Sequence, residues 1–235
     1  MNKLVSLLLA GLFVCGSGVA RDVTSFNTGW QFKKGPFSAD AMKAASQWEG
    51  KWETVEIPHT WNARDMQVRY NNFYEEVGYY KKNFFCPGDL KDKRVFLRFE
   101  GVGACSEVYV NGRLAGTHKG GYSAFVVEIG PSLNPGSDNE IVVKADNQSR
   151  PDVIPVNHVL FGVYGGIYRP VWLVVTGKSS IAVNDCASSG VYIIQKNVSK
   201  RSADSDVKVK MEHAALHPGP GVVENTIYPQ EDREV

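Results

Sequence analysis

The sequence predicts an all-β fold, a β-sandwich of short antiparallel strands, and three observations indicate it. Residues 95–100, VFLRFE, alternate apolar and charged side chains with the period of two that is typical of a half-buried strand. Asn111-Gly112 separates two apolar runs, and this pair tolerates the positive φ of a type I′ hairpin turn. No helix-length apolar pattern is available for parallel crossovers, so a sandwich is favoured.

Residues 1–20 have the features of a secretory signal peptide. Lys3 supplies a positive start, residues 4–14 are apolar, and Gly18-Val19-Ala20 places small residues where signal peptidase cuts. The apolar run is too short to span a bilayer. We therefore expect an exported protein, periplasmic or secreted, without a membrane span.

Strand patterns extend on both sides of the hairpin. The same alternation recurs in residues 25–32, 52–57, 77–86, 125–129, 141–143 and 165–174. Pro58 ends one of these strands, because proline has no N–H to donate to a ladder. Residues 40–48 place alanines at a spacing that suits one or two turns of helix.

The expected domain boundary is Lys178–Ser180. A chain of 235 residues with 43% hydrophobic content suffices for one full domain and part of another. After the boundary, residues 181–183, 191–194 and 207–211 have the pattern of the opening strands of an immunoglobulin-like sandwich. Such a sandwich needs about seven strands and about 100 residues, so the second domain is expected to be incomplete.

The charge balance argues against nucleic acid as a partner. Removing residues 1–20 takes Lys3 from the 26 basic side chains, which leaves 25 against 25 acidic ones. No basic stripe interrupts this balance. Neither nucleic acid nor an anionic membrane surface is expected to bind.

Cysteine spacing gives no sign of a disulfide framework or of a cysteine-ligated zinc site. Cys86, Cys105 and Cys186 follow the signal peptide, an odd number without a CxxC pair. The signatures of a phosphate-binding loop and of a nucleophile elbow are absent as well. We expect no metal, no cofactor and a buried free thiol at Cys105.

Seven short motifs occur together in a characteristic order. They are Pro58-His59-Thr60-Trp61-Asn62, Gly78-Tyr79-Tyr80-Lys81-Lys82, Phe99-Glu100-Gly101-Val102, Val108-Tyr109-Val110-Asn111-Gly112, Lys119-Gly120-Gly121-Tyr122 with Phe125, Asp146-Asn147, and Gly165-Gly166-Ile167-Tyr168-Arg169. Over residues 25–176 the chain resembles the N-terminal sugar-binding jelly-roll domain of glycoside hydrolase family 2, the β-galactosidase, β-glucuronidase and β-mannosidase group. The tail to Val235 is similar to the start of the family's immunoglobulin-like domain.

This resemblance implies a jelly-roll β-sandwich over residues 21–178 and an incomplete immunoglobulin-like sandwich over 179–235, which a catalytic TIM barrel follows in the family. Retaining glycosidases use two carboxyl groups about 5–5.5 Å apart, and the family's two glutamates lie beyond residue 235. Adjacent Glu75 and Glu76 point to opposite sides of an extended segment and cannot bracket a bond. The chain is expected to contain no catalytic residue and to be a fragment of an exported glycosidase.

The expected partners are therefore carbohydrate and the missing barrel, and the sequence specifies no oligomeric state. In the family, jelly-roll loops reach over the barrel mouth and help to bind the sugar. The first long loop offers polar groups that suit sugar hydroxyls: Asn62, Asp65, Asn72 and Tyr74. The second loop, residues 148–166, supplies pocket lining: His158, Phe161 and Tyr164.

Alternatives remain open at several of these positions. Asn62 and Asp65 equally suit capping of backbone N–H groups within the loop. His59 and Trp61 follow a strand end, where core packing is the commoner role. At Leu160, relatives that resemble β-galactosidase carry an acidic residue that meets sugar and a monovalent cation, which argues against galactose specificity and against that cation site.

Other residues of the motifs are expected to be structural. Turns and close backbone approaches account for Asn111, Gly112, Gly120, Gly121, Gly165 and Gly166. Arg169 is expected to anchor the second loop by bidentate hydrogen bonds to a carboxylate or to backbone carbonyls.

Two other functions fit the same fold. A free-standing carbohydrate-binding module would show a flat row of exposed aromatic side chains on one sheet face and would end with its last strand. An adhesion-type structural sandwich is disfavoured by the two loops with sugar-pocket side chains.

Overall fold

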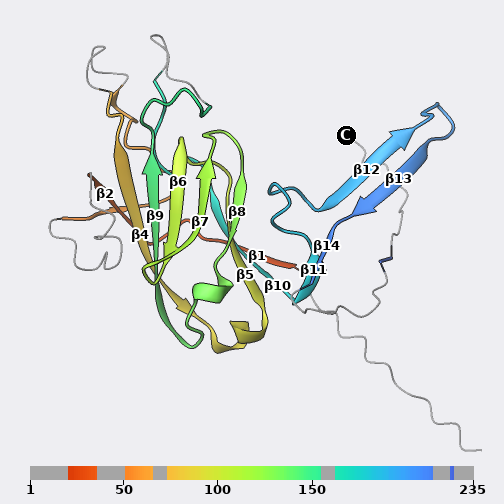
Figure 1. Ribbon diagram of the computed structural model, residues 1–235, viewed down its shortest axis with the longest axis horizontal. Coiled ribbons are helices and arrows are strands. Elements are labelled where there is room, and N and C mark those ends of the chain that lie inside the picture. Colours follow the sequence, from red (N-terminus) through yellow and green to blue (C-terminus); the bar gives the residue numbers. More distant parts are fainter. Residues whose placement is uncertain (1–20, 36–50, 66–72, 155–161, 214–222, 225–235) are drawn as a thin grey trace, which may run out of the picture.

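A computed structural model describes residues 21–35, 51–65, 73–154, 162–213 and 223–224. Within these ranges the regular elements are strands and two short 3-10 turns (Figure 1). They are β1 (Arg21–Ser25), β2 (Trp30–Lys34), β3 (Glu53–Val55), β4 (Val77–Cys86), η3 (Gly88–Asp92), β5 (Arg94–Phe99), β6 (Cys105–Val110), β7 (Arg113–Lys119), β8 (Phe125–Glu128), η4 (Gly130–Ser132), β9 (Ser137–Asp146), β10 (Val171–Thr176), β11 (Ser179–Ile181), β12 (Val191–Lys196), β13 (Asp204–Val209) and β14 (Met211–His213). The described residues include no helix long and apolar enough to cross a membrane.

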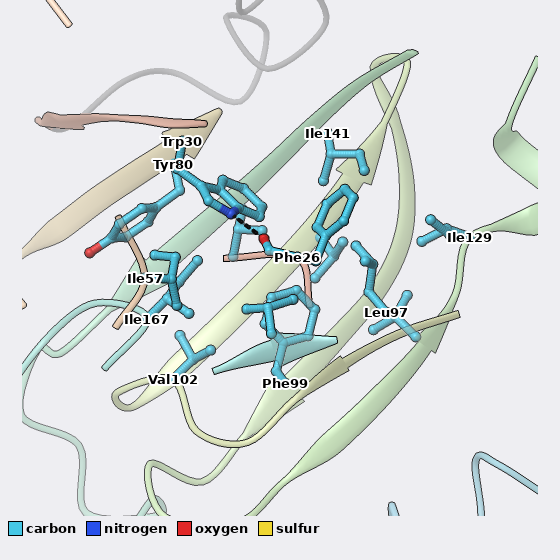
Figure 2. Close-up of a cluster of buried hydrophobic side chains, with 14 of the residues drawn as sticks. Phe26, Trp30, Ile57, Tyr80, Leu97, Phe99, Val102, Ile129, Ile141 and Ile167 are labelled. Carbon is cyan, nitrogen blue, oxygen red and sulfur yellow. Dashed lines mark hydrogen bonds between the residues drawn. The ribbon is translucent and has the colours of Figure 1, made fainter. Parts of the chain in front are cut away.

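Two antiparallel sheets make the sandwich. One has four strands in the order β1-β10-β5-β8, and the other has six in the order β3-β2-β4-β9-β6-β7. Their inner faces meet in one core, where Trp30, Tyr80, Phe99 and Ile141 are all 0% exposed (Figure 2). The expected all-β jelly-roll sandwich is confirmed.

β6 and β7 form the hairpin that the Asn-Gly pair predicts. Asn111 has φ of 51° and Gly112 has φ of 75°, as a type I′ turn requires. Asn111 Nδ2 also donates to Ser132 O at 2.8 Å and to Asn139 Oδ1 at 2.7 Å. The asparagine therefore shapes the turn and ties it to η4 and to β9.

Residues 25–32 form two strands where the alternation predicts one. β1 ends at Ser25 and pairs with β10, whereas β2 begins at Trp30 and pairs with β3 and β4 in the opposite sheet. The crossing passes through Gly29, with φ of 73°, and Trp30 Nε1 donates to Phe26 O at 2.7 Å (Figure 2). The aromatic side chains before and after the crossing point into the same core. The sequence therefore keeps its alternating pattern although the chain changes sheets.

The strand expected over residues 165–174 begins later, at Val171. Gly166 has φ of 104° and forms only an isolated bridge with Gly103. Pro170 lacks the N–H that would extend the ladder toward the N-terminus. The helix expected over residues 40–48 lies outside the described residues.

The alternation of β5 predicts a half-buried strand, but in the structure both faces of β5 are buried. Leu97 and Phe99 point into the main core. On the outer face, Phe96 packs with Val174 and Val183 in a separate apolar cluster. The segment after β11 therefore covers this side of the four-stranded sheet.

Beyond β10 the chain forms two small sheets, β11 with β14 and β12 with β13. The expected boundary at Lys178–Ser180 falls at the start of β11. Arg94 joins this region to the sandwich, because its guanidinium donates to Glu128 at 2.8 Å and to Glu212 of β14 at 2.6 Å.

Candidate functional site

The described stems of the two long loops meet at one end of the sandwich. This is the end where β4 begins and β9 finishes, the upper end in Figure 1. Hydrogen bonds connect the segments 59–65, 73–76, 147–154 and 162–167 there. The two loops predicted to contact sugar are therefore neighbours in space.

Asn62 is the centre of this arrangement. Its Oδ1 accepts from Gly165 N at 2.8 Å and from Asn147 Nδ2 at 3.2 Å, and its Nδ2 donates to Asp65 Oδ2 at 2.6 Å and to Tyr74 O at 3.0 Å. An amide side chain offers two acceptor positions and two N–H donors, so this one is fully used. Asn62 is 0% exposed and its amide is occupied within the loops, which favours the loop-capping alternative over contact with a sugar.

Asn147 is a second buried amide in the same network. Its Nδ2 donates to Val163 O at 2.7 Å and to Tyr74 O at 3.1 Å, while its Oδ1 accepts from Glu76 N at 2.9 Å. Sequence reasoning missed this role, although Asp146-Asn147 was one of the ordered motifs. We call the pair Asn62 and Asn147 the amide hub.

Asp65 and Tyr74 contribute mainly to the stem of the first loop. Asp65 Oδ2 accepts from Tyr74 N at 3.0 Å as well as from Asn62, so this carboxylate caps loop backbone, the alternative considered for it. The Tyr74 hydroxyl donates to Val77 O at 3.4 Å, and Lys34 Nζ lies 4.6 Å from the ring centroid. Burial raises the pKa of Tyr74, and nearby Glu76 adds to the effect.

Trp61 packs between two glycines that come from different segments. A Cβ at Gly78 would lie 2.4 Å from the indole, and one at Gly165 would lie 1.9 Å from it. Phe32 stacks on the indole with ring centroids 5.7 Å apart. Trp61 therefore has the core-packing role and not a ligand-binding one.

His59 also forms its contacts with other residues of the sandwich. Its Nδ1 lies 2.8 Å from the Tyr80 hydroxyl, and its backbone N–H donates to Ile167 O at 2.8 Å. Burial lowers the pKa of His59, so the ring is neutral near pH 7. The core-packing interpretation fits this geometry.

Tyr164 is the predicted site residue that presents an aromatic surface to solvent. It is 43% exposed, and its ring makes an edge contact with Phe73 at 5.9 Å between centroids. Its carbonyl oxygen would lie 2.1 Å from a Cβ at Gly103, so only glycine permits this loop path. Asn72, His158 and Phe161 lie outside the described residues.

Tyr122 is a further exposed aromatic side chain, which sequence reasoning placed in a motif but not in a site. It is 65% exposed and follows Gly120 and Gly121. Gly121 N donates to Ile154 O at 2.7 Å, and the Tyr168 hydroxyl donates to Gly121 O, so the turn is bound to the second loop. The feature of the sequence that could have identified Tyr122 is the Gly120-Gly121-Tyr122 turn.

The motif glycines lie where a side chain would not fit or where φ is positive. Gly166 has φ of 104°, and a Cβ there would lie 2.4 Å from the Tyr80 hydroxyl. Gly120 has φ of 126°. Arg169 is exposed, and its side chain forms no hydrogen bond or ion pair with a described residue. In the described part of the chain the amide hub joins the second loop to the first, and the anchoring role of Arg169 stays a prediction.

The three described cysteines are free thiols, but Cys105 is only half-buried and Cys86 is the buried one. Cys105 is the first of the β6 residues whose side chains point away from the core, and it lines a surface pocket. Burial raises the pKa of the Cys105 thiol. No group of three metal-binding side chains occurs in the described ranges.

Comparisons with known proteins agree with this geometry. Residues 23–177 match the family described as glycosyl hydrolases family 2, sugar binding domain. A β-glucuronidase of Bacteroides fragilis is 35% identical over 212 residues, 90% of this chain and 29% of that protein. A β-galactosidase of Thermoanaerobacter pseudethanolicus is 33% identical over 75% of this chain and 23% of its own length.

Solved structures show the same relation. A Bacteroides fragilis protein assigned as a β-galactosidase superposes with a TM-score of 0.79 and 72% identity, over 85% of this chain and 30% of the other. A β-glucuronidase of Bacteroides uniformis superposes with a TM-score of 0.73 and 31% identity, over 80% of this chain and 22% of the other. This chain thus spans about a third or less of each relative's length, and it belongs to glycoside hydrolase family 2 through that family's sugar-binding domain.

Proposed function

We propose that this chain is the non-catalytic, sugar-binding portion of an exported family 2 glycosidase that hydrolyses O-glycosidic bonds of β-linked sugars. The observation that carries the proposal is the loop end of the sandwich. There the amide hub holds two loop stems together, and Tyr164 and Tyr122 remain exposed beside them. Exposed aromatic rings on rigid stems suit the apolar faces of a sugar ring.

The carboxylates at this end do not form a hydrolytic pair. Asp65 is engaged with Asn62 and with the backbone of Tyr74. Glu75 and Glu76 are sequence neighbours just before β4, and Glu76 is the more exposed of the two. A retaining glycosidase needs two carboxyl groups about 5–5.5 Å apart across one bond. In our proposal a separate catalytic domain of a longer protein supplies them.

The relatives define the substrate class to test. They are named β-glucuronidases and β-galactosidases, so the proposed substrate is a β-glycoside of one of these sugars. The acidic residue expected of galactose-specific relatives is replaced by Leu160 in this sequence. This replacement favours the glucuronide as the first substrate to assay.

The first experiment is to sequence the transcript across the codon of Val235. An in-frame continuation that encodes a barrel with two glutamates, and a product that releases nitrophenol from a nitrophenyl β-glucuronide or β-galactoside, would support the proposal. Hydrolysis of neither by that longer product would contradict it. Sequencing the N-terminus of the mature protein tests export, because cleavage after Ala20 leaves Arg21 first.

A free-standing carbohydrate-binding module is the second candidate. The closed core of the sandwich favours it, since the central side chains need no further domain to be buried. Against it, the outer face of the six-stranded sheet buries Tyr79 to 2% exposure beside Val142, so this aromatic face is not a flat exposed row. A stop codon directly after Val235, together with sugar binding by the chain, would establish this alternative.

A further inference from the structure

A second polar site lies on the outer face of the six-stranded sheet. It is a pocket of about 260 Å³ between β6, β7 and β9. The strand register places two outward rows of three side chains across it. One row is Lys119, Cys105 and Asp146, and the next is Thr117, Glu107 and Lys144.

The charged side chains that line this pocket are all engaged in ion pairs. Lys144 Nζ lies 2.6 Å from Glu107 Oε1, and Arg150 forms an ion pair with Asp146. Glu107 and Lys144 are 33% and 28% exposed, so both remain reachable from solvent. The third cation of the lining, Lys119, pairs with Asp152 at 3.1 Å, a carboxylate that is not itself part of the lining. Phosphate and other polyanions gain little from this pocket, because each of its cations already has a carboxylate partner.

One lining residue also has unused hydrogen-bonding capacity. Arg150 Nε is buried and has no hydrogen-bond partner in the described part of the chain. Ser106 Oγ is unpartnered too, but Ser106 alternates with Cys105 and Glu107 and therefore faces the sandwich core, away from the pocket. Buried polar groups normally have partners, and an exception needs an explanation. A ligand rich in hydroxyl groups would supply acceptors and donors to a site of this kind.

We propose that the β6–β7–β9 pocket binds one neutral sugar residue, with Glu107 and Lys144 contacting its hydroxyls and Thr117 forming the outer wall. This inference rests on the proposed function only for carbohydrate as the ligand class; it adds a site for a neutral sugar that is separate in position from the loop end. Asp146 faces the pocket, whereas its neighbour Asn147 faces the amide hub. The two sites therefore adjoin through one strand end.

The ionisation of the lining supports this chemistry. Burial alone would raise the pKa of Glu107, but hydrogen bonds from Lys144 and from Tyr109 outweigh it and hold the pKa below its usual value. Glu107 is therefore a carboxylate at neutral pH and accepts hydrogen bonds from sugar hydroxyls. Tyr109 is the next outward residue of β6 and extends the surface with an aromatic ring.

The test is an NMR titration of the full chain with methyl β-D-galactopyranoside and methyl β-D-glucopyranoside. We expect amide shifts on β6, β7 and β9 to saturate with one of these glycosides. Inorganic phosphate and glucuronic acid should bind there at least about tenfold more weakly. Equal or tighter binding of phosphate at the pocket would overturn the proposal.

Two variants and a matched control locate the binding. Thr117→Trp fills the mouth from an exposed position, and Glu107→Gln keeps the shape while weakening the acceptor; each should raise Kd about tenfold or more. Asn83→Trp places the same bulk at an exposed position of β4, opposite Glu140 and outside the pocket, and should leave Kd unchanged. Thermal melting of each variant separates loss of binding from loss of folding.

The result also distinguishes this inference from the proposed function. If Tyr164→Ala abolishes sugar binding while Thr117→Trp does not, the sugar binds at the loop end and the pocket proposal is wrong. If no neutral glycoside binds the chain but the longer protein still hydrolyses a β-glycoside, the pocket proposal fails and the proposed function stands.

Discussion

The sandwich and the β12–β13 ribbon are both built from strands that contain apolar side chains, but the two regions differ in burial. In the sandwich, β5 and β9 bury most of their residues, whereas β12 and β13 expose nearly all of theirs. Ile141 is 0% exposed and Ile193 is 66% exposed. Alternation in a sequence thus predicts that a strand has an apolar face, but it does not predict whether another layer covers that face.

The largest effect should separate the two regions directly. Phe99→Ala removes a fully buried ring that stacks on Phe125 at 4.8 Å, and we expect a loss of about 3–5 kcal/mol in unfolding free energy. Ile193→Ala in the ribbon should change it by less than about 0.5 kcal/mol. Urea unfolding monitored by tryptophan fluorescence measures both. Similar losses would mean that the ribbon is buried in solution.

The amide hub should give the next largest effect. Asn62→Ala removes four hydrogen bonds and leaves the Gly165 N–H without its acceptor, which should cost about 2–3 kcal/mol. Asn83→Ala, at an exposed strand position, is the matched control and should be nearly neutral. An Asn62→Ala protein as stable as the wild type would show that the loop stems are not joined through this amide.

A smaller effect is expected where the two regions meet. Arg94→Met breaks the contacts with Glu128 and Glu212, and its side chain is 13% exposed, so we expect a loss of about 1–2 kcal/mol. Hydrogen exchange should rise in residues 179–213 more than in the sandwich core. Lys178→Met removes an ion pair with Asp92 in which both side chains are exposed, and it should have little effect on stability. Unchanged exchange in Arg94→Met would contradict this coupling.

The smallest effect concerns acid. Burial lowers the pKa of both His59 and His118 in the sandwich. As pH falls below about 6.5, the unfolded chain binds these protons before the folded chain does, so stability decreases toward the lowered folded-state pKa. Melting curves between pH 7.5 and 5 should show a shallower decline for His118→Phe than for the wild type. An identical decline in both proteins would show that His118 does not contribute to the loss of stability in acid.

Much of the sandwich could be predicted because local signals and packing agree there. The Asn111-Gly112 turn and the β4 strand were both expected with the bounds observed. The crossing at Gly29 was missed, because burial in one shared core leaves the alternation unbroken from Phe26 to Phe32. Local pattern contains no information on which sheet a strand joins.

The site was predicted less well than the fold. Asn62 and Tyr164 have equally suitable chemistry in the sequence, but one is buried in the amide hub and the other is exposed. Asn147 was assigned no site role, since its contacts come from segments 71 and 16 residues away. Contacts of that range depend on the fold, and a local sequence pattern does not show them.

The position of Trp61 between Gly78 and Gly165 bears on how this site can diversify. One indole fixes the distance between the stem of the first loop, the start of β4 and the second loop. None of these stems can move without displacing the others. Under the proposed function, we therefore expect sugar preference to depend on side chains beyond the stems, such as the exposed Tyr164, and not on the stems themselves.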